Sequence, residues 1–413
     1  MTRHLLAYRQ LLLLTAIHFT VDMLSGTLPG FLPELRREYD LSLVTGTALL
    51  TLCSFSSNGI QVWAGTLRKS AKRPMLVQLG LVLSCAICLV CLTPHVFTTL
   101  FLTLLVLILG FGVAFTHPEG LRGICALPEN TVSPAVATSL FMLAGFSGYA
   151  TGPLLGGLLV QFFGFPGLLL LLLPVACLLI LFHRSRVRLA LDEKSGSPTA
   201  ARPESGNSPS PQKSLPAANC TFRELFWLAV LINTGCCIIQ GLLPSYLAEL
   251  DFSLGFGGFS GTLFGLGAGL GAFGTSFLIR RVPVIRCLTL EILIGIPVLV
   301  CYLLLAGYAA AAVLVPFAGL LVGAGFPQLV VLARTAPGKL ALGARMGMIV
   351  GGSWGIAGIA LLLAGVIGKY FMLRSAMFLA PAAFAGAFCM LLILGRRGKR
   401  TSAVVATRRG ISS

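Results

Sequence analysis

Residues 17–35 read IHFTVDMLSGTLPGFLPEL and lie in the first long apolar run of the chain. His18 and Asp22 interrupt that run, and their four-residue spacing puts them on one face of a helix. A charged Asp near the centre of a bilayer costs about 2.5–3.5 kcal/mol on insertion scales, so such a residue faces a cavity or a partner. The stretch therefore predicts a first membrane-spanning helix that carries a functional site.

The composition of the chain is that of an integral membrane protein. Its 413 residues are 56% hydrophobic and 10% charged, whereas soluble proteins carry about 25% charged residues. The net charge of +17 does not indicate nucleic-acid binding, because the basic residues stand at the ends of apolar runs and do not form a face. The first apolar run reaches a full spanning length, so it is expected to be a retained helix and not a cleaved signal peptide.

Twelve apolar runs are long enough to cross a bilayer as helices. The expected spans are Leu11–Leu32, Thr45–Leu67, Pro74–Leu92, Val96–Thr116, Ala135–Phe163, Pro166–Phe182, Leu225–Leu247, Leu254–Ile279, Val284–Leu305, Ala309–Leu332, Ala341–Ile367 and Met372–Leu394. Residues 192–219 are rich in Ser, Pro, Ala and Gly, which predicts a disordered linker. We expect four parts: an N-terminal six-helix half, a cytoplasmic linker, a C-terminal six-helix half and a basic cytoplasmic tail, at residues 1–183, 184–221, 222–395 and 396–413.

The basic residues predict the orientation of the chain. If both termini are cytoplasmic, 26 of the 30 Lys and Arg residues lie on the cytoplasmic side. The other four are Arg36, Arg37, Lys369 and Arg374. The positive-inside rule therefore predicts that both termini are cytoplasmic.

The two halves repeat one another in sequence. Gly26–Leu35 reads GTLPGFLPEL and Gly241–Leu250 reads GLLPSYLAEL, so Gly, Leu, Pro, Leu, Glu and Leu recur in register. In that alignment His18 and Asp22 correspond to Asn233 and Cys237. A parallel repeat of six helices is the architecture of major facilitator transporters, whose site lies between the halves. The predicted fold is therefore an all-α membrane protein with twelve transmembrane helices in two parallel-repeat halves.

The fifth predicted span carries the most specific motif, GYATGPLLGG at residues 148–157. Its glycines allow close helix approach, and its proline bends the helix and frees a carbonyl. The residues are Gly148, Gly152, Pro153, Gly156 and Gly157. The pattern resembles the antiporter motif of major facilitator exporters, which implies export in exchange for protons; ordinary helix packing is the alternative.

A second motif, His117-Pro118-Glu119 followed by Arg122, stands at the expected cytoplasmic end of the fourth span. Glu119 and Arg122 can pair at three-residue spacing. Two interpretations are open for this motif. It is either an ion pair that completes a helix end, or a cytoplasmic gate that breaks and re-forms during transport.

Three segments together resemble the fosmidomycin-resistance family of major facilitator proteins: HFTVD in the first span, GVAFTHPEGLR after the fourth, and FPQLVVLARTAPGKLALGARMGMIVGG from residue 326. The resemblance covers nearly the whole chain except the linker. It implies a bacterial inner-membrane drug exporter driven by inward proton flow. On that resemblance, His18 and Asp22 form the proton site, and His117, Glu119, Arg122 and Arg334 belong to the cytoplasmic gate.

Two motifs of the wider superfamily are altered here. Lys69 stands where the motif after the second span has Asp, and Val106 stands where the fourth span of many drug/proton antiporters has Arg. Because the second half has uncharged partners for His18 and Asp22, proton coupling is expected to depend on the first helix.

Other polar residues of the spans have two interpretations. They either line the central cavity or form helix–helix hydrogen bonds; they are Asn58, Gln61, Gln240 and Gln328. Glu291 on the ninth span is expected to pair with Arg286 or to reach the membrane surface, with a transport role as the alternative. The twelve cysteines lie mostly in apolar runs without His or carboxylate neighbours, so no metal site is expected.

These features favour a proton-coupled exporter of a small organic compound, monomeric and without a cofactor, whose partners are substrate, protons and the lipid bilayer. A proton symporter that imports a small anion or sugar is the first alternative. A transport-dead sensor or scaffold on the same fold is the second. An enzyme is not expected, since no catalytic constellation or Walker-type loop is present.

Overall fold

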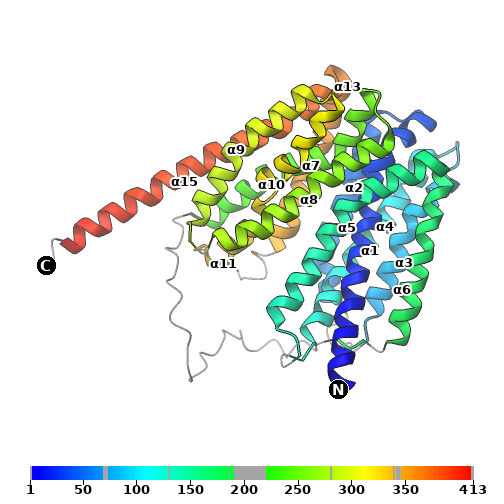
Figure 1. Ribbon diagram of the computed structural model, residues 1–413, viewed down its shortest axis with the longest axis horizontal. Coiled ribbons are helices and arrows are strands. Elements are labelled where there is room, and N and C mark those ends of the chain that lie inside the picture. The colour runs from blue at the N-terminus through cyan, green and yellow to red at the C-terminus, as the bar shows by residue number, and fades with distance from the viewer. Residues whose placement is uncertain are drawn as a thin grey trace.

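A computed structural model of the protein describes residues 2–67, 73–128, 131–185, 187–189, 220–279, 281–337, 340, 345 and 347–410. Twelve helical segments of these residues are long and apolar enough to cross a membrane. They form two bundles that lie side by side, as Figure 1 shows. The predicted fold class, with twelve spans in two halves, is confirmed.

The first bundle contains six spans. They are α1 (Thr2–Glu38), α2 (Leu43–Thr66), α3 (Met75–Ser84) with η1 (Cys85–Leu92), α4 (Thr98–Cys125), α5 (Pro134–Phe163), and η2 (Phe165–Leu171) with α6 (Leu172–Arg184).

The second bundle contains the other six. They are α7 (Phe222–Glu249), α8 (Leu254–Leu278), α9 (Val284–Leu305), η3 (Ala309–Val313) with α10 (Leu314–Val322) and α11 (Gly325–Thr335), η4 (Met348–Gly352) with α13 (Ser353–Phe371), and α14 (Leu373–Met377) with α15 (Leu379–Gly410). The linker expected at residues 184–221 lies mostly outside the described residues.

The sequence repeat has a counterpart in local geometry. Asp40 follows α1 and Asp251 follows α7, and both have positive φ, at 47° and 62°. Two residues later, Ser42 and Ser253 cap α2 and α8, each accepting a hydrogen bond from the backbone three residues on. A side-chain oxygen at this position satisfies a backbone N–H that the helix leaves free. The first and second helices of each half are thus joined in the same way.

Several helices end at places other than those expected. The fourth span was expected to end at Thr116, but α4 continues to Cys125 with Pro118 inside it. A proline removes one helical hydrogen bond, yet membrane helices tolerate it where neighbours satisfy the freed groups. The twelfth span was expected to end at Leu394, but α15 continues to Gly410. The longer α4 is what carries His117 into the bundle.

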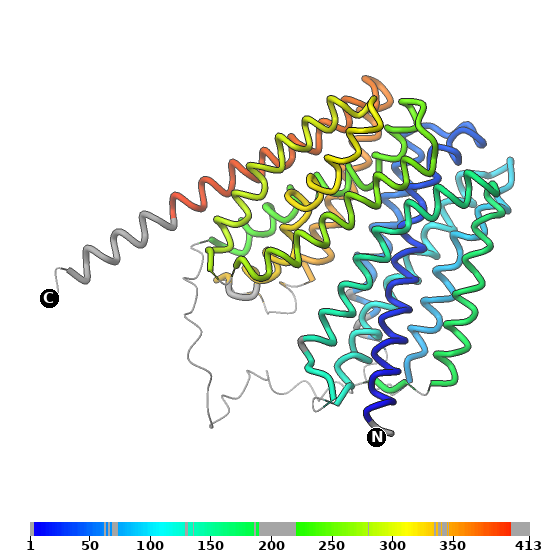
Figure 2. The backbone as a smooth tube through the Cα atoms, in the orientation of Figure 1, coloured from blue at the N-terminus to red at the C-terminus, as the bar shows by residue number. Residues whose placement is uncertain are grey.

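Helix α1 lies at the centre of the first bundle and packs most extensively on α5. A methyl group added at Gly152 or Gly30 would overlap the backbone of the other helix. The small residues therefore let the two backbones touch, as in other tightly packed membrane helices. The tube in Figure 2 follows α1 through this bundle.

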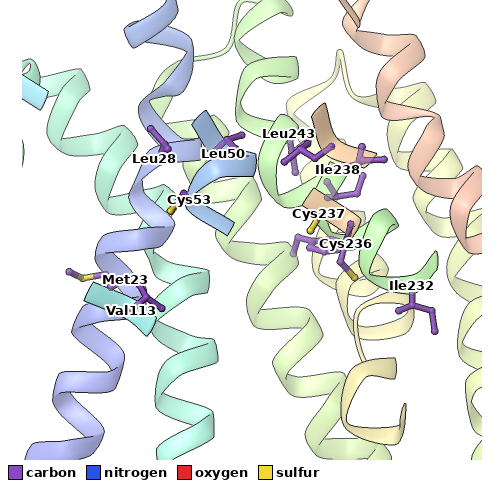
Figure 3. Close-up of a cluster of buried hydrophobic side chains, with 14 of the residues drawn as sticks. Met23, Leu28, Leu50, Cys53, Val113, Ile232, Cys236, Cys237, Ile238 and Leu243 are labelled. Carbon is purple, nitrogen blue, oxygen red and sulfur yellow. The ribbon is translucent and has the colours of Figure 1, made fainter. Parts of the chain in front are cut away.

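The two halves touch mainly near the helix ends farthest from the N terminus. There α5 packs on α8, and α2 packs on α13. Thr51 donates a hydrogen bond to the carbonyl of Gly358 at 2.7 Å, and the side chain of Thr47 fills the space over Gly365. Buried apolar side chains continue the contact, since Leu50 of α2 lies beside Gly241 of α7. Figure 3 shows Leu50 and Cys53 of the first half and Cys237 of α7.

The tenth span is interrupted. Helix α10 ends at Val322, α11 begins at Gly325, and Gly323 and Ala324 lie between them. Interrupted helices in transporters line the sites where substrates or ions bind. Gln328, a cavity candidate from the sequence, lies in the first turn of α11.

Candidate functional site

Three ionisable side chains meet in the middle of the first bundle. Asp22 of α1 lies between His18, on the same helix, and His117 of α4. The distances are 3.3 Å from His18 Nε2 to Asp22 Oδ2 and 2.9 Å from His117 Nε2 to Asp22 Oδ1. The rings of the two histidines are 4.7 Å apart, edge to face. We call these three residues the His–Asp–His cluster.

The cluster adds a contact to a residue that the resemblance assigned to the cytoplasmic gate. The fourth span was expected to end at Thr116, one residue before His117. Since α4 continues past Pro118, His117 lies inside the helix and faces α1. The sequence carried no direct signal for this contact, because Asp22 and His117 are 95 positions apart. The buried Asp22 alone indicated that a partner was required.

Helix α5 closes the cluster from the other side. His18 Nδ1 lies 2.7 Å from the carbonyl oxygen of Phe141, and the Phe141 ring stacks on the imidazole at 4.0 Å. A carbonyl oxygen only accepts hydrogen bonds, so Nδ1 of His18 carries a proton and donates it. The other ring nitrogen, Nε2, is therefore the one that faces Asp22.

Gly145, one turn after Phe141, makes room for the cluster. A methyl group added there would lie 2.5 Å from His18 Nε2 and 2.6 Å from Asp22 Oδ2. No side chain larger than hydrogen fits without moving the pair. The sequence analysis did not single out Gly145, because its role depends on a contact with α1 that the sequence pattern does not show.

Burial is graded across the cluster. The side chains of His18, Asp22 and His117 are 5%, 13% and 22% exposed. The inner end is thus enclosed by α1 and α5, while the His117 end is open to water-sized molecules. A proton can reach the cluster through His117 without passing the packed helices around His18.

The ligand atoms of the cluster all lie within 4.8 Å of one another, a spacing that three ligands of one metal ion also have. Structural zinc sites have four protein ligands and catalytic ones three. Among the described residues, no fourth His, Cys or acidic side chain belongs to this group. The geometry of the cluster therefore fits a proton or a metal ion, and removal of metal with a chelator distinguishes the two.

Two of the expected gate residues, Glu119 and Arg122, follow His117 on α4 by two and five positions. Glu119 is 3% exposed, and its Oε2 accepts a hydrogen bond from the backbone of Val77 at 3.0 Å. Glu119 thus binds the start of α3, a contact additional to any pairing with Arg122. The side chain of Arg334 lies outside the described residues.

The glycine motif of α5 lies where three helices cross. Gly148 and Gly156 contact the backbone of α1 at Phe19 and Thr27. Gly157 contacts the backbone of α8 at Leu254, and a methyl group there would lie 2.5 Å from its carbonyl oxygen. The motif therefore packs within its own half and against the other half.

The corresponding place in the second half carries no charge. Asn233 is fully buried and donates a hydrogen bond to Ser353 Oγ of α13 at 2.8 Å. Cys237, the counterpart of Asp22, is also buried. The repeat thus has an ionisable version of the site in the first half and an uncharged version in the second.

The other polar candidates fall into different environments. Asn58 donates to the carbonyl of Ser54 on its own helix. Gln61 and Gln240 are partly buried. Gln328 is 2% exposed and donates to Glu291 Oε2 at 2.6 Å. The Glu291 carboxylate is thus bonded to a neighbouring helix. One interpretation of the sequence had instead directed it to the membrane surface.

Several solved structures share this fold. A bacterial homologue of the human lysosomal transporter Spinster, in an inward-facing and unoccupied conformation, superposes with a TM-score of 0.72 over 96% of this chain and 98% of its own, at 14% identity. The nucleoside transporter NupG gives 0.69 at 12% identity over 93% and 99%. The peptide transporter POT in complex with sulfate gives 0.70 at 13% identity over 95% and 94%.

No curated protein sequence matches this chain. The family model described as the Major Facilitator Superfamily matches residues 14–347, which is most of the chain. Together with the twelve spans and the two-bundle fold, this match identifies the protein as a multi-pass membrane protein that belongs to the Major Facilitator Superfamily.

Proposed function

We propose that this protein exports a small organic compound in exchange for protons, and that the His–Asp–His cluster binds and releases the proton. The observation that carries the proposal is the hydrogen bond from His18 Nδ1 to the carbonyl of Phe141. It leaves Nε2 of a neutral His18 with a lone pair directed at a carboxylate oxygen 3.3 Å away. Two lone pairs do not face each other stably, so a proton is required on His18 or on Asp22.

His117 gives that proton a route. Its Nε2 lies 2.9 Å from the second oxygen of Asp22, within hydrogen-bond range, and it is the most exposed member of the cluster. Histidine is the side chain that gains and loses a proton near neutral pH. A proton taken up at His117 can therefore pass to Asp22 and His18, and the charge of the cluster changes with its occupancy.

The packing of the halves supports alternating access. The contacts between α5 and α8 and between α2 and α13 lie toward the membrane side opposite the termini, which favours a conformation that is open on the side of the termini. With both termini in the cytoplasm of a bacterial cell, as the distribution of basic residues predicts, that side is the cytoplasm. Uptake of one proton makes the cluster neutral overall, because an imidazolium then faces the carboxylate, and so favours the conformation in which the cluster is most enclosed.

The resemblance to the fosmidomycin-resistance family suggests fosmidomycin as the first compound to test. Wild-type protein in proteoliposomes is expected to accumulate it against a concentration gradient when a pH gradient is imposed. Asp22→Asn is expected to lower that gradient-driven accumulation by about tenfold or more, within the usual range of coupling energies. Passive exchange of the compound between the two sides is expected to continue.

Glu34→Gln is the matched control. It makes the same change from carboxylate to amide on the same helix, but Glu34 pairs with Arg37 at the far end, away from the cluster. This variant is expected to keep gradient-driven accumulation. If Asp22→Asn accumulates the compound as well as wild type does, the assignment of the proton site is wrong.

The direction of transport separates export from import. An antiporter accumulates the compound in the compartment from which protons leave, whereas a symporter accumulates it where protons arrive. The glycine motif of α5 favours the first. No accumulation of any compound by wild-type protein across a broad panel would instead favour the sensor or scaffold.

A further inference from the structure

A second acid lies inside a membrane span, in the half that lacks the His–Asp–His cluster. Glu291 of α9 accepts two hydrogen bonds, one from each of two neighbouring helices. Thr275 Oγ1 of α8 donates to its Oε1 at 2.5 Å, and Gln328 Nε2 of α11 donates to its Oε2 at 2.6 Å. Three helices thus meet at one carboxyl group. Neither the proposed function nor the gate uses this group.

Glu291 has no cationic partner among the side chains that the structure describes. The ionisable groups on the elements packed against it are Arg286, Cys287, Cys301 and Tyr302 on α9 itself and Cys389, Arg396 and Arg397 on α15, while α8, α10 and η3 carry none. Arg334 of α11 has a side chain outside the described residues. The Arg286–Glu291 pair that the sequence suggested is not found. An ionised carboxylate in a span without a counter-charge is costly, so this acid is expected to carry a function.

Gln328 supplies the second observation. Its side chain is 2% exposed, and its Oε1 atom is buried without a hydrogen-bond partner. A buried acceptor with no donor is destabilising by about 1–3 kcal/mol. A protonated Glu291 has an O–H to donate, and a half-turn of the Gln328 amide would present Oε1 to it. Protonation of the acid would therefore satisfy the oxygen that is unpaired now.

The short distances indicate a proton as the occupant and not a metal ion. The bonds from Thr275 and Gln328 to Glu291 are 2.5 and 2.6 Å, so no space is left between the bonded atoms. Bound cations stand about 2.0–2.6 Å from each oxygen ligand, so an ion between these atoms would force them apart. A proton needs only the half-turn of the Gln328 amide.

The position of Gln328 connects the acid to a movable element. Gln328 lies in the first turn of α11, directly after the interruption at Gly323 and Ala324. Because no continuous helix joins α11 to α10, α11 can change its orientation while α10 stays packed on α8 and α9. A change in the hydrogen bond between Glu291 and Gln328 is therefore expected to change the orientation of α11 relative to α10.

We propose that Glu291 is a second proton-binding site, in the C-terminal half, and that its occupancy determines the hydrogen bond to Gln328 and the orientation of α11. That this proton contributes to transport rests on the proposed function; the binding of the proton and the response of α11 do not. The C-terminal half has uncharged Asn233 and Cys237 at the positions that match His18 and Asp22. It thus carries its own ionisable group elsewhere, at Glu291 of α9.

Infrared difference spectroscopy of the purified full chain between alkaline and acidic pH tests the first part. Wild-type protein is expected to gain a C=O band of a protonated carboxylic acid that Glu291→Gln lacks. Gln328→Leu and Thr275→Val are expected to keep that band at a shifted frequency, since each removes one hydrogen bond. These two variants keep the test decisive if Glu291→Gln does not fold. Asp22→Asn is expected to leave the Glu291 band in place.

Hydrogen exchange of the α11 backbone in the same two conditions tests the second part. The protection of the α11 amides, which is the intrinsic exchange rate at each pH divided by the observed rate, is expected to change with pH in wild-type protein and in Asp22→Asn, but not in Glu291→Gln. A spectrum in which Glu291→Gln removes no pH-dependent band would overturn the proposal. If Asp22→Asn and Glu291→Gln both keep gradient-driven transport, the proposed function is wrong. The proton site at Glu291 is then unaffected, because the infrared band tests it separately.

Discussion

Gly145 shows how a single residue without a functional group determines the chemistry of a site. Its hydrogen side chain leaves the space in which His18 and Asp22 approach to 3.3 Å. Any larger residue would push the imidazole off the carbonyl of Phe141 or push Asp22 toward His117. The proposed proton site therefore consists of three ionisable side chains and one residue that is small.

Gly145→Ala is expected to separate proton coupling from folding. Overpacking by one methyl group costs about 1–3 kcal/mol, which a twelve-helix protein tolerates, but the displaced cluster should lose about tenfold or more of its gradient-driven transport. Gly269→Ala is the control, because a methyl group there meets no atom within 4 Å. Fosmidomycin accumulation and thermal unfolding, measured on both variants, check this. Unchanged coupling in Gly145→Ala would contradict the role of the tight contact.

Metal removal distinguishes the two occupants that the cluster geometry allows. If the cluster acts as a proton site, gradient-driven transport is expected to be the same before and after treatment with EDTA. A metal bound by His18, Asp22 and His117 would be lost or displaced, and transport would fall. Transport assays on one preparation, with metal content measured in parallel, give the answer.

The residues also show where sequence reasoning reaches its limit. His18 and Asp22 were predicted together, because a helix repeat relates positions four apart. His117 was identified as a motif residue and assigned to the gate on the family resemblance, and its contact with Asp22 was not predicted. Gly145 and Phe141 were not identified, because each acts through a contact with a helix more than 100 positions away.

At the scale of helices, the crossing of α1, α5 and α8 connects the site to the rest of the molecule. The backbone carbonyl oxygen of Pro153 contacts both Gly30 of α1 and Gly258 of α8, and a methyl group at either glycine would overlap it. The first contact is inside one half and remains when the halves move. The second joins the halves and exists only in conformations that are closed on this side.

Two alanine substitutions are expected to distinguish these contacts. Gly30→Ala should lower the thermal stability in every conformation, by an amount of the order of 1–3 kcal/mol. Gly258→Ala should instead shift the population toward conformations in which α5 and α8 are apart, seen as faster hydrogen exchange in both helices. Gly274→Ala, where a methyl group meets open space, should do neither. Equal behaviour of the first two variants would contradict the distinction.

Much of the helix arrangement was predictable. Twelve spans were expected and twelve are present among the described residues, because spanning length and apolar composition are strong local signals. Their ends were less predictable, since Pro118 does not terminate α4 and polar residues after Leu394 do not terminate α15. The interruption after Val322 was also missed, because Gly323 and Ala324 are unremarkable in a membrane helix.

At the scale of the whole molecule, the two halves share a fold and differ in chemistry. The first half has the His–Asp–His cluster, and the second has the Asn233–Ser353 hydrogen bond in its place. The halves touch at one side of the membrane, so in the proposed mechanism a change in charge at the cluster alters the balance between conformations in which the cluster is enclosed and open. The proposal thus links proton occupancy and access to the substrate through one equilibrium.

Proton exchange for substrate at the His–Asp–His cluster is tested most directly by the release of protons when fosmidomycin binds to the purified protein in weakly buffered solution. An antiporter whose substrate and proton exclude each other should release protons as the compound binds, with binding followed by calorimetry. Wild-type protein and Glu34→Gln are expected to release them, and Asp22→Asn is expected to release none from the cluster. Uptake of protons, or the same release from Asp22→Asn as from wild type, would contradict the account.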